Sequence, residues 1–191
     1  AVAAFQRGDW SVAELRCRDI IGIQPDNYSA LSMLGIVAAQ TRRAFEAAEL
    51  FSRAASVCPE RAEAHGNLGN VLHGLKRFEE ALASYDRALA IEPRYVRALN
   101  KRGMVLHDLQ RYAEASASHD RALGIKPDYA EVLNGRGVAS CDLRRFEEAI
   151  ASFDRALAIQ SDCALGRPDV AFESFDRALA IRPDAAGALV N

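Results

Sequence analysis

The sequence predicts an all-α protein, built as a solenoid of stacked antiparallel helix pairs that repeat every 34 residues. Prolines and glycines recur at this interval in a common phase, at Pro25, Pro59, Pro93 and Pro127 and at Gly35, Gly69, Gly103 and Gly137. Longer blocks return with them, since the segment that begins at Phe78 is matched by the one that begins at Phe146. Such a period indicates a repeat architecture, because one helix pair cannot bury its apolar face without a neighbour.

Two helices are expected within each period, and the unit 62–95 shows why. Its first half places apolar or small residues at i, i+3, i+4 and i+7, which is one face of a helix. A tight turn is expected at residues 74–77. The second helix carries Tyr85 on its packed face and ends before Pro93, which discourages further helix. Gly69 allows the two backbones to approach closely.

The same pattern divides the whole chain in order. Residues 1–27 are a partial repeat, with the end of a first helix at about 1–8 and a second helix from about Trp10 to Ile23. Four complete repeats are predicted next, at 28–61, 62–95, 96–129 and 130–163. A foreshortened unit at 164–185 and the start of another first helix at 186–191 complete the expected single array.

The period is broken once, near the C-terminal end. Phe153 and its equivalent Phe175 are 22 residues apart, twelve short of the full repeat. Either most of a first helix is deleted, or a dozen residues are missing from the sequence. We favour missing residues, because an orphaned second helix would expose Ala171, Phe175 and Leu179. Both ends of the chain also fall inside repeats, as expected of a segment of a longer chain.

The phased positions resemble the tetratricopeptide repeat family over essentially all 191 residues. In the unit 62–95 the family's signature positions carry Leu68, Gly69, Ala81, Tyr85, Ala88 and Pro93. The departures are Arg102 and Arg136 in place of leucine, His119 in place of an aromatic residue and Ser161 in place of proline. The resemblance implies a right-handed superhelix whose first helices line a concave groove that binds a protein or peptide.

Composition excludes several other classes of function. The net charge is −2, from 24 Lys and Arg against 26 Asp and Glu, so nothing in the overall charge favours nucleic acid. No apolar run approaches the ~20 residues that span a bilayer. The four cysteines form no Cys-x-x-Cys pair, which argues against a zinc module or a disulfide framework. We expect no nucleic-acid partner, no membrane insertion and a cytoplasmic location.

No catalytic constellation is recognisable, so this segment is expected not to be an enzyme and to need no cofactor or metal. Phosphate-binding loops and hydrolase or metalloprotease motifs are absent from the sequence. His65 and His119 fall at core positions. His73 and His107 share a repeat position but should lie too far apart to coordinate one metal ion. Cys141 has no base or cation arranged around it. A catalytic domain elsewhere in a parent chain stays open.

The predicted functional surface is the groove lined by first helices. Its polar residues are Asn67, Asn70, His73, Arg97, Asn100, Lys101, His107 and Asn134. Amide side chains offer both a donor and an acceptor, which suits the backbone of an extended peptide. Arg97 and Lys101 lie one helical turn apart and favour an acidic group of the ligand, while Asp108 and Asp142 are expected to offset part of that charge.

Two alternatives to a peptide-binding scaffold stay open. The segment Asn67-Leu-Gly-Asn-Val-Leu72 is similar to the inner helices of O-linked N-acetylglucosamine transferases and their bacterial relatives, which implies the substrate-recognition arm of a larger enzyme. Lys101 and Gly135 replace the equivalents of Asn67, so the inner asparagines do not recur at one position. The second alternative is a self-associating assembly module, because end repeats without polar caps expose core-like faces.

Overall fold

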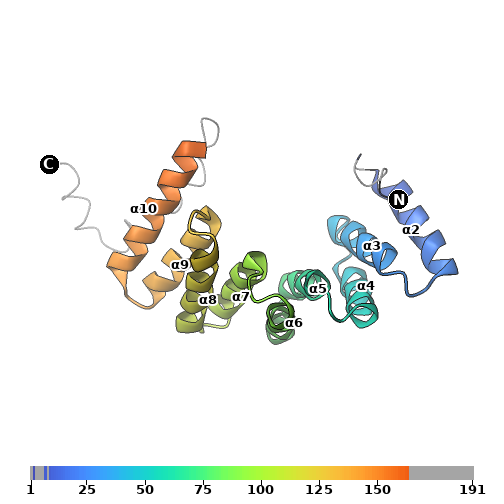
Figure 1. Cartoon of the computed structure of the whole chain (residues 1–191), viewed down its shortest axis with the longest axis horizontal. Coiled ribbons are helices and arrows are strands. Elements are labelled where there is room, and N and C mark those ends of the chain that lie inside the picture. The colour runs from blue at the N-terminus through green and yellow to red at the C-terminus, as the bar shows by residue number, and fades with distance from the viewer. Residues whose placement is uncertain (1, 3–6, 8, 164–191) are drawn as a thin grey trace. The chain divides into compact units, whose positions relative to one another are not determined.

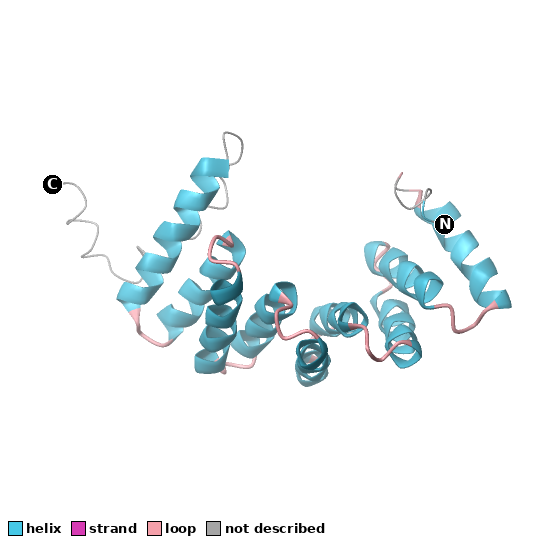
Figure 2. Cartoon of the chain, in the orientation of Figure 1, coloured by secondary structure: helices cyan, strands magenta, loops and turns pink. Residues whose placement is uncertain are grey.

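The structure, a computed structural model, describes residues 2, 7 and 9–163. These residues form helices and no strand, which confirms the all-α prediction (Figures 1 and 2). The helices are α2 (Trp10–Ile23), α3 (Tyr28–Gln40), α4 (Ala44–Val57), α5 (Ala62–Gly74), α6 (Phe78–Ile91), α7 (Val96–Asp108), α8 (Tyr112–Ile125), α9 (Ala130–Asp142) and α10 (Phe146–Cys163). The expected first helix at 1–8, the foreshortened unit and the segment 186–191 lie outside the described part.

The chain divides into two compact units, Ala1–Ala98 and Leu99–Asn191, and the boundary falls within α7. In the first unit α3 pairs with α4 and α5 with α6, while α2 packs on α3. In the second unit α9 contacts both α8 and α10. Consecutive helices are therefore neighbours in space, as the repeat pattern predicts.

Helix ends follow the sequence signals closely. Asp9 and Asn27 cap α2 and α3, since each side-chain oxygen accepts a hydrogen bond from the backbone N–H three residues later, at 3.2 and 3.0 Å. Most second helices end one or two residues before the repeated proline. In α10 that position is Ser161, and the helix continues to Cys163, so that it has 18 residues where α4, α6 and α8 have 14. Without the proline ring nothing stops the helix there.

The turn inside each helix pair has a recurrent left-handed residue. These residues have φ near +60° and lie 34 residues apart, at Arg42, Lys76, Gln110 and Arg144. At Lys76 the backbone N–H donates to the carbonyl oxygen of His73 at 2.9 Å, and the next N–H, of Arg77, donates to that of Leu72 at 2.9 Å. This is the Schellman closure of a helix C-terminus. It usually employs glycine, so Lys76 holds a conformation that costs free energy.

Substitutions at Lys76 should therefore follow backbone preference. Glycine should equal or exceed lysine in stability, because relief of the left-handed strain is partly offset by the greater entropy of the unfolded glycine chain. Valine, branched at Cβ, should be less stable than glycine by ~1–2 kcal/mol. Urea unfolding of Lys76→Gly and Lys76→Val measures both. Equal stability of the two variants would contradict a backbone origin.

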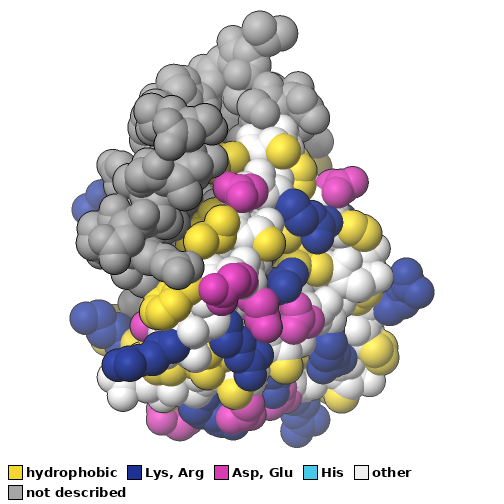
Figure 3. Space-filling view, turned by 90° about the vertical axis from the view of Figure 1, so that its left-hand side faces the viewer, with side chains coloured by type: hydrophobic (Ala, Val, Ile, Leu, Met, Phe, Trp, Pro, Cys, Tyr) yellow, Lys and Arg dark blue, Asp and Glu magenta, His cyan; other side chains and the backbone are white. Residues whose placement is uncertain are grey.

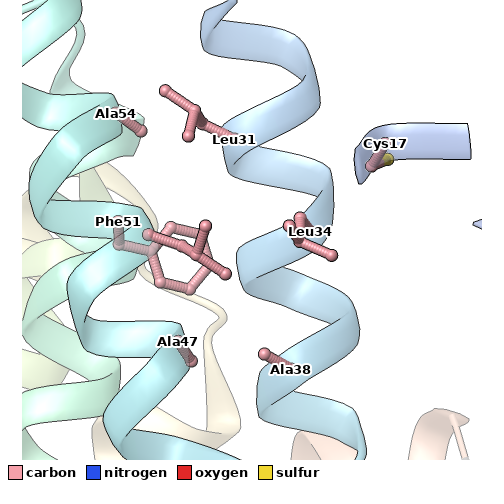
Figure 4. Packing of buried hydrophobic residues seen from close by; sticks show 8 residues of the cluster. Cys17, Leu31, Leu34, Ala38, Ala47, Phe51 and Ala54 are labelled. Atoms are coloured by element: carbon pink, nitrogen blue, oxygen red, sulfur yellow. The ribbon is translucent and has the colours of Figure 1, made fainter. Parts of the chain in front are cut away.

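The core of the first unit is built from apolar side chains of α3 and α4. Figure 4 shows Leu31 and Ala38 of α3 on the side toward α4, with Cys17 of α2 on the other side of α3. Cys17 has 0% exposure, as expected for a cysteine at a core position. Between the paired helices, a Cβ atom added to Gly35 would lie 2.9 Å from the ring of Phe51. The repeated glycine is thus required by the aromatic ring opposite it.

An ion-pair network fixes α2 to the rest of the first unit. Glu14 of α2 binds the guanidinium of Arg43 at 2.6 Å and that of Arg18 at 2.9 Å, and Arg18 also binds Glu46 of α4 at 2.7 Å. The hydrogen bonds from Arg43 and Arg18 lower the pKa of Glu14 to about 2. The network therefore keeps its charges over the ordinary pH range.

Charges of both signs are mixed on the surface. On the face shown in Figure 3, Lys and Arg side chains lie beside Asp and Glu, with small apolar patches between them. This mixing accords with the net charge of −2. Within the described residues, no helix has the length and apolar character needed to cross a membrane.

Candidate functional site

The predicted groove residues share one side of the first helices, which we name the first-helix face. On α5 the face contains Asn67, Asn70 and His73, at i, i+3 and i+6, whereas Gly69 and Leu72 are buried. The complete set is Asn67, Asn70, His73 and Arg97 in the first unit and Asn100, Lys101, His107 and Asn134 in the second. Each unit is described separately below.

In the first unit Asn70 is exposed and half of its hydrogen-bonding capacity is used. Its Oδ1 accepts a hydrogen bond of 2.8 Å from the hydroxyl of Tyr85. Burial raises the pKa of Tyr85, so the hydroxyl keeps its proton and remains the donor. The amide nitrogen of Asn70 makes no hydrogen bond with the described residues and is available to a ligand. His73 is half-buried beside Phe78, and their ring centroids are 5.9 Å apart.

Arg97 is the exposed cation of this unit. It forms no ion pair with any residue that the structure describes, although its charge acts on the neighbouring hydroxyl of Tyr95 together with the charges of Glu63 and Glu92. Asn67 is half-buried. The first unit thus presents an amide donor on α5 and an uncompensated guanidinium at the start of α7.

In the second unit the first-helix residues are largely engaged with one another. Asn100 is only 2% exposed, and its Nδ2 donates to Glu131 at 2.9 Å. Lys101 binds the same carboxylate oxygen at 3.1 Å. Asn100 therefore does not present an open amide; it holds Glu131, and Glu131 compensates the charge of Lys101. Sequence reasoning missed Glu131, which lies 30 residues from Lys101 on the next first helix.

Two further groups complete this face of the second unit. His107 Nε2 lies 2.7 Å from Asp142 Oδ2, so Asp142 pairs with this histidine rather than with Lys101. The side-chain oxygens of Asn100 and Asn134 are buried and accept no hydrogen bond from the described residues. Buried acceptors without a donor are rare in folded proteins, because each one costs its desolvation free energy. Asn134 is half-buried as a whole, so its amide reaches the surface.

The remaining titratable residues do not assemble into a catalytic or metal site. No group of three metal-ligating side chains occurs in the part of the chain that is described. Burial raises the pKa of Cys17 and of Cys141, whereas a nucleophilic cysteine needs a lowered pKa. His65 donates from Nε2 to the carbonyl oxygen of Pro59 at 3.0 Å, and His119 is 1% exposed, so both lie in the core as predicted.

The structure also contains two hollows that sequence reasoning did not find, between α4 and α6. Their volumes are about 520 and 360 Å³, and both are lined by Ser52 and Leu68. In the second unit the position of Leu68 is taken by Arg102, which donates to Ser118 at 2.6 Å, and by Arg136. Phe45, 73% exposed, lines the larger hollow. An aromatic residue where two other repeats have Glu79 and Glu147 was the available signal.

Antiparallel helix pairs in a 34-residue register, with glycine set against an aromatic or histidine ring in each pair, define a helical-repeat protein of the scaffold class. Profiles of the tetratricopeptide repeat match residues 62–95 and, with a second profile, residues 1–56 and 100–162. The chain belongs to the tetratricopeptide repeat family. Among curated protein sequences, none matches it.

Solved structures share this fold at low sequence identity. A crystal structure of MamA has a TM-score of 0.79 and 22% identity, covering 84% of this chain and 94% of that chain. YrrB, described as a tetratricopeptide repeat protein with an unusual peptide-binding site, has a TM-score of 0.75 and 21% identity, covering 91% and 87%. A tetratricopeptide repeat protein from Parabacteroides merdae has a TM-score of 0.81 and 21% identity, covering 98% and 73%.

Proposed function

We propose that the chain is a protein-interaction scaffold that binds an extended segment of a partner protein on the first-helix face. The observation that carries the proposal is the unused hydrogen-bonding capacity of that face. Asn70 has a free amide donor beside an acceptor that Tyr85 already occupies, and Asn134 has an acceptor without a donor. A peptide backbone offers a carbonyl oxygen and an N–H at every residue, so it complements both groups.

The charge of the face indicates which side chains the ligand should carry. Lys101 is balanced by Glu131 at 3.1 Å, whereas Arg97 has no ion-pair partner in the described part of the chain. An acidic group of the ligand is therefore expected next to Arg97 rather than next to Lys101. Selectivity for acidic peptides should be modest, since Arg97 is exposed and Glu63 and Glu92 are nearby.

The fold family supports a binding role of this kind. YrrB, which shares the fold, carries a peptide-binding site according to its description. The chain does not need a catalytic group for such a function, and its polar side chains on first helices are those best placed to contact a partner laid along the repeats. Glu131 and Asn100 would act as positioning residues that hold Lys101 in place.

The proposal is tested by selecting ligands from a displayed library of random peptides and measuring affinities by fluorescence anisotropy. Arg97→Glu should weaken a selected acidic peptide by about tenfold or more, because a charge-assisted hydrogen bond contributes ~1.5–3 kcal/mol when shielded and less when exposed. The variant should also show a flatter dependence on salt. Lys101→Gln should have a smaller effect, since Glu131 already offsets that charge.

The matched control lies on the second helices. Glu79→Lys changes an exposed charge by the same amount on α6 and should leave peptide affinity unchanged. If Glu79→Lys abolishes binding while Arg97→Glu is silent, the partner binds the side of the hollows between α4 and α6, and the proposal for the first-helix face is wrong. Selection of no peptide by a folded chain also contradicts it.

A further inference from the structure

The outward face of α2 differs from the outward faces of the other second helices. Three exposed positions can be compared at 34-residue intervals. Val12 stands where the other helices have Glu46, Glu80, Glu114 and Glu148. Leu15 stands where they have Glu49, Ala83, Ala117 and Ala151. Asp19 stands where they have Arg53, Arg87, Arg121 and Arg155. The face of α2 thus carries a large apolar side chain at two positions and the opposite charge at the third.

These apolar side chains are not part of the core of the first unit. Val12, Leu15 and Ile23 are 41, 60 and 81% exposed. The opposite side of α2 is fully used, because Ala13 and Cys17 have 0% exposure. Since that side is also held by the ion pairs of Glu14, α2 cannot rotate to bury its outward residues without breaking them. Exposed apolar side chains gathered on one helix face favour contact with another protein surface.

The order of residues on this face is self-complementary. Val12, Arg16, Asp19 and Ile23 follow one another at i, i+4, i+7 and i+11, the spacing of a helix-pairing stripe. In an antiparallel pair of α2 helices whose midpoint lies between Cys17 and Arg18, Val12 of one protomer faces Ile23 of the other. In the same pair Arg16 of one protomer faces Asp19 of the other.

We propose that the outward face of α2 is a contact between two copies of this chain, formed as an antiparallel helix pair with two-fold symmetry. A two-fold axis repeats each contact, so the pair contains two apolar contacts and two ion pairs. Leu15 and Ile20, 60 and 36% exposed, border the stripe on its two sides and widen the apolar area. A parallel pair would set Arg16 against Arg16 and Asp19 against Asp19, which is repulsive.

The charges support a second copy as the occupant. Neither Arg16 nor Asp19 forms an ion pair with the residues that the structure describes, so both are available. Because the stripe contains one charge of each sign, symmetrically placed about its midpoint, the surface that complements it is the same stripe reversed. The contact leaves the first-helix face uncovered on α5, so it is independent of peptide binding there.

The dimer should be weak. One 14-residue helix offers less than the ~800 Å² per partner of standard stable interfaces. Sedimentation equilibrium over roughly 5–500 μM chain should therefore show a reversible monomer–dimer equilibrium, with dissociation at the low end. A chain that remains monomeric over the whole range overturns the proposal.

Charge reversal gives the sharper test. Arg16→Asp places two acidic residues opposite each other, and Asp19→Arg places two arginines opposite each other, so each single variant should weaken dimerisation by about tenfold. The double variant R16D/D19R restores opposite charges across the two-fold axis and should recover the dimer. All of these positions are exposed, and circular dichroism should show unchanged folding.

A matched control and the contrary outcomes complete the test. Val12→Glu restores the residue of the other second helices and should abolish the dimer, whereas Ala83→Glu, at the position of α6 that corresponds to Leu15, should leave it intact. If the single reversals weaken the dimer but the double variant does not rescue it, or if Ala83→Glu is as disruptive as Val12→Glu, the copies meet through another surface. Either result refutes the antiparallel α2 contact.

Discussion

Replacing His119 by phenylalanine is expected to stabilise the protein by ~1–3 kcal/mol at neutral pH. The imidazole is 1% exposed, and its Nδ1 is buried without a hydrogen-bond partner in the described residues. Phenylalanine occupies the same repeat position at Phe51 and Phe153, opposite the same glycine. The substitution removes the unpaired nitrogen and keeps the aromatic ring, so the desolvation cost disappears and the packing remains.

The same variant should lose a pH dependence that the natural sequence shows. Burial, with a smaller contribution from the charge of His107 and against the opposite effect of Glu131, lowers the pKa of His119 from 6.5 to about 4. The unfolded chain therefore binds the proton first as pH falls. Stability is fully present above the unfolded pKa of ~6.5 and is lost progressively toward pH ~4, by up to about 3 kcal/mol.

Urea unfolding at about pH 7.5 and about pH 5 measures this difference. His119→Phe should be more stable at both values, and its margin should widen at the lower pH. His65→Phe is the matched control, because His65 is also buried but donates to the carbonyl oxygen of Pro59, so its replacement should not stabilise. A margin for His119→Phe that stays constant with pH would mean that His119 titrates normally in the folded protein.

Gly69→Ala should destabilise the first unit by ~1–3 kcal/mol, although alanine is the better helix former. An added Cβ would lie 2.8 Å from Cε1 and 2.9 Å from Cζ of Tyr85. Tyr85 cannot move aside easily, because it is 1% exposed and its hydroxyl is held by Asn70. The cost therefore comes from displacement of α5 from α6.

Gly74→Ala provides the control on the same helix. An added Cβ there meets nothing within 4 Å, so the variant should gain roughly 0.5–1 kcal/mol from helix propensity. Thermal or urea unfolding of the two variants compares the same chemical change at two places on α5. If both shift stability in the same direction, the close approach at Gly69 does not limit the packing of the pair.

The helices were largely predictable from sequence because their limits depend on local signals. The second helix from Trp10 to Ile23 was expected at the bounds that the structure gives. Ser161 in place of proline was visible in the sequence, and the longer α10 follows from it. The left-handed turn residue at Lys76 was less evident, since Gly74 is the residue with the greater conformational freedom in that segment.

The first-helix face was less predictable, because the state of each side chain depends on a neighbour one repeat away. Asn100 resembles an open groove amide in sequence, but Glu131 on the next first helix binds it and covers it. The hollows between α4 and α6 were also hidden, since they depend on the volume that Leu68 leaves beside Ser52. Periodicity places a residue on a face; it does not report what contacts it there.

The recurrent turn residues place protease-sensitive bonds at the centre of successive helix pairs. Arg42-Arg43, Lys76-Arg77 and Arg144-Arg145 are dibasic, and Arg111 follows Gln110 at the fourth turn. A protease must extend several residues on either side of the bond it cuts, which the closed hydrogen-bonded turn does not permit. Trypsin therefore cuts at rates set by transient opening of individual helix pairs. The chain thus carries, at each turn, an internal reporter of how independently its repeats unfold.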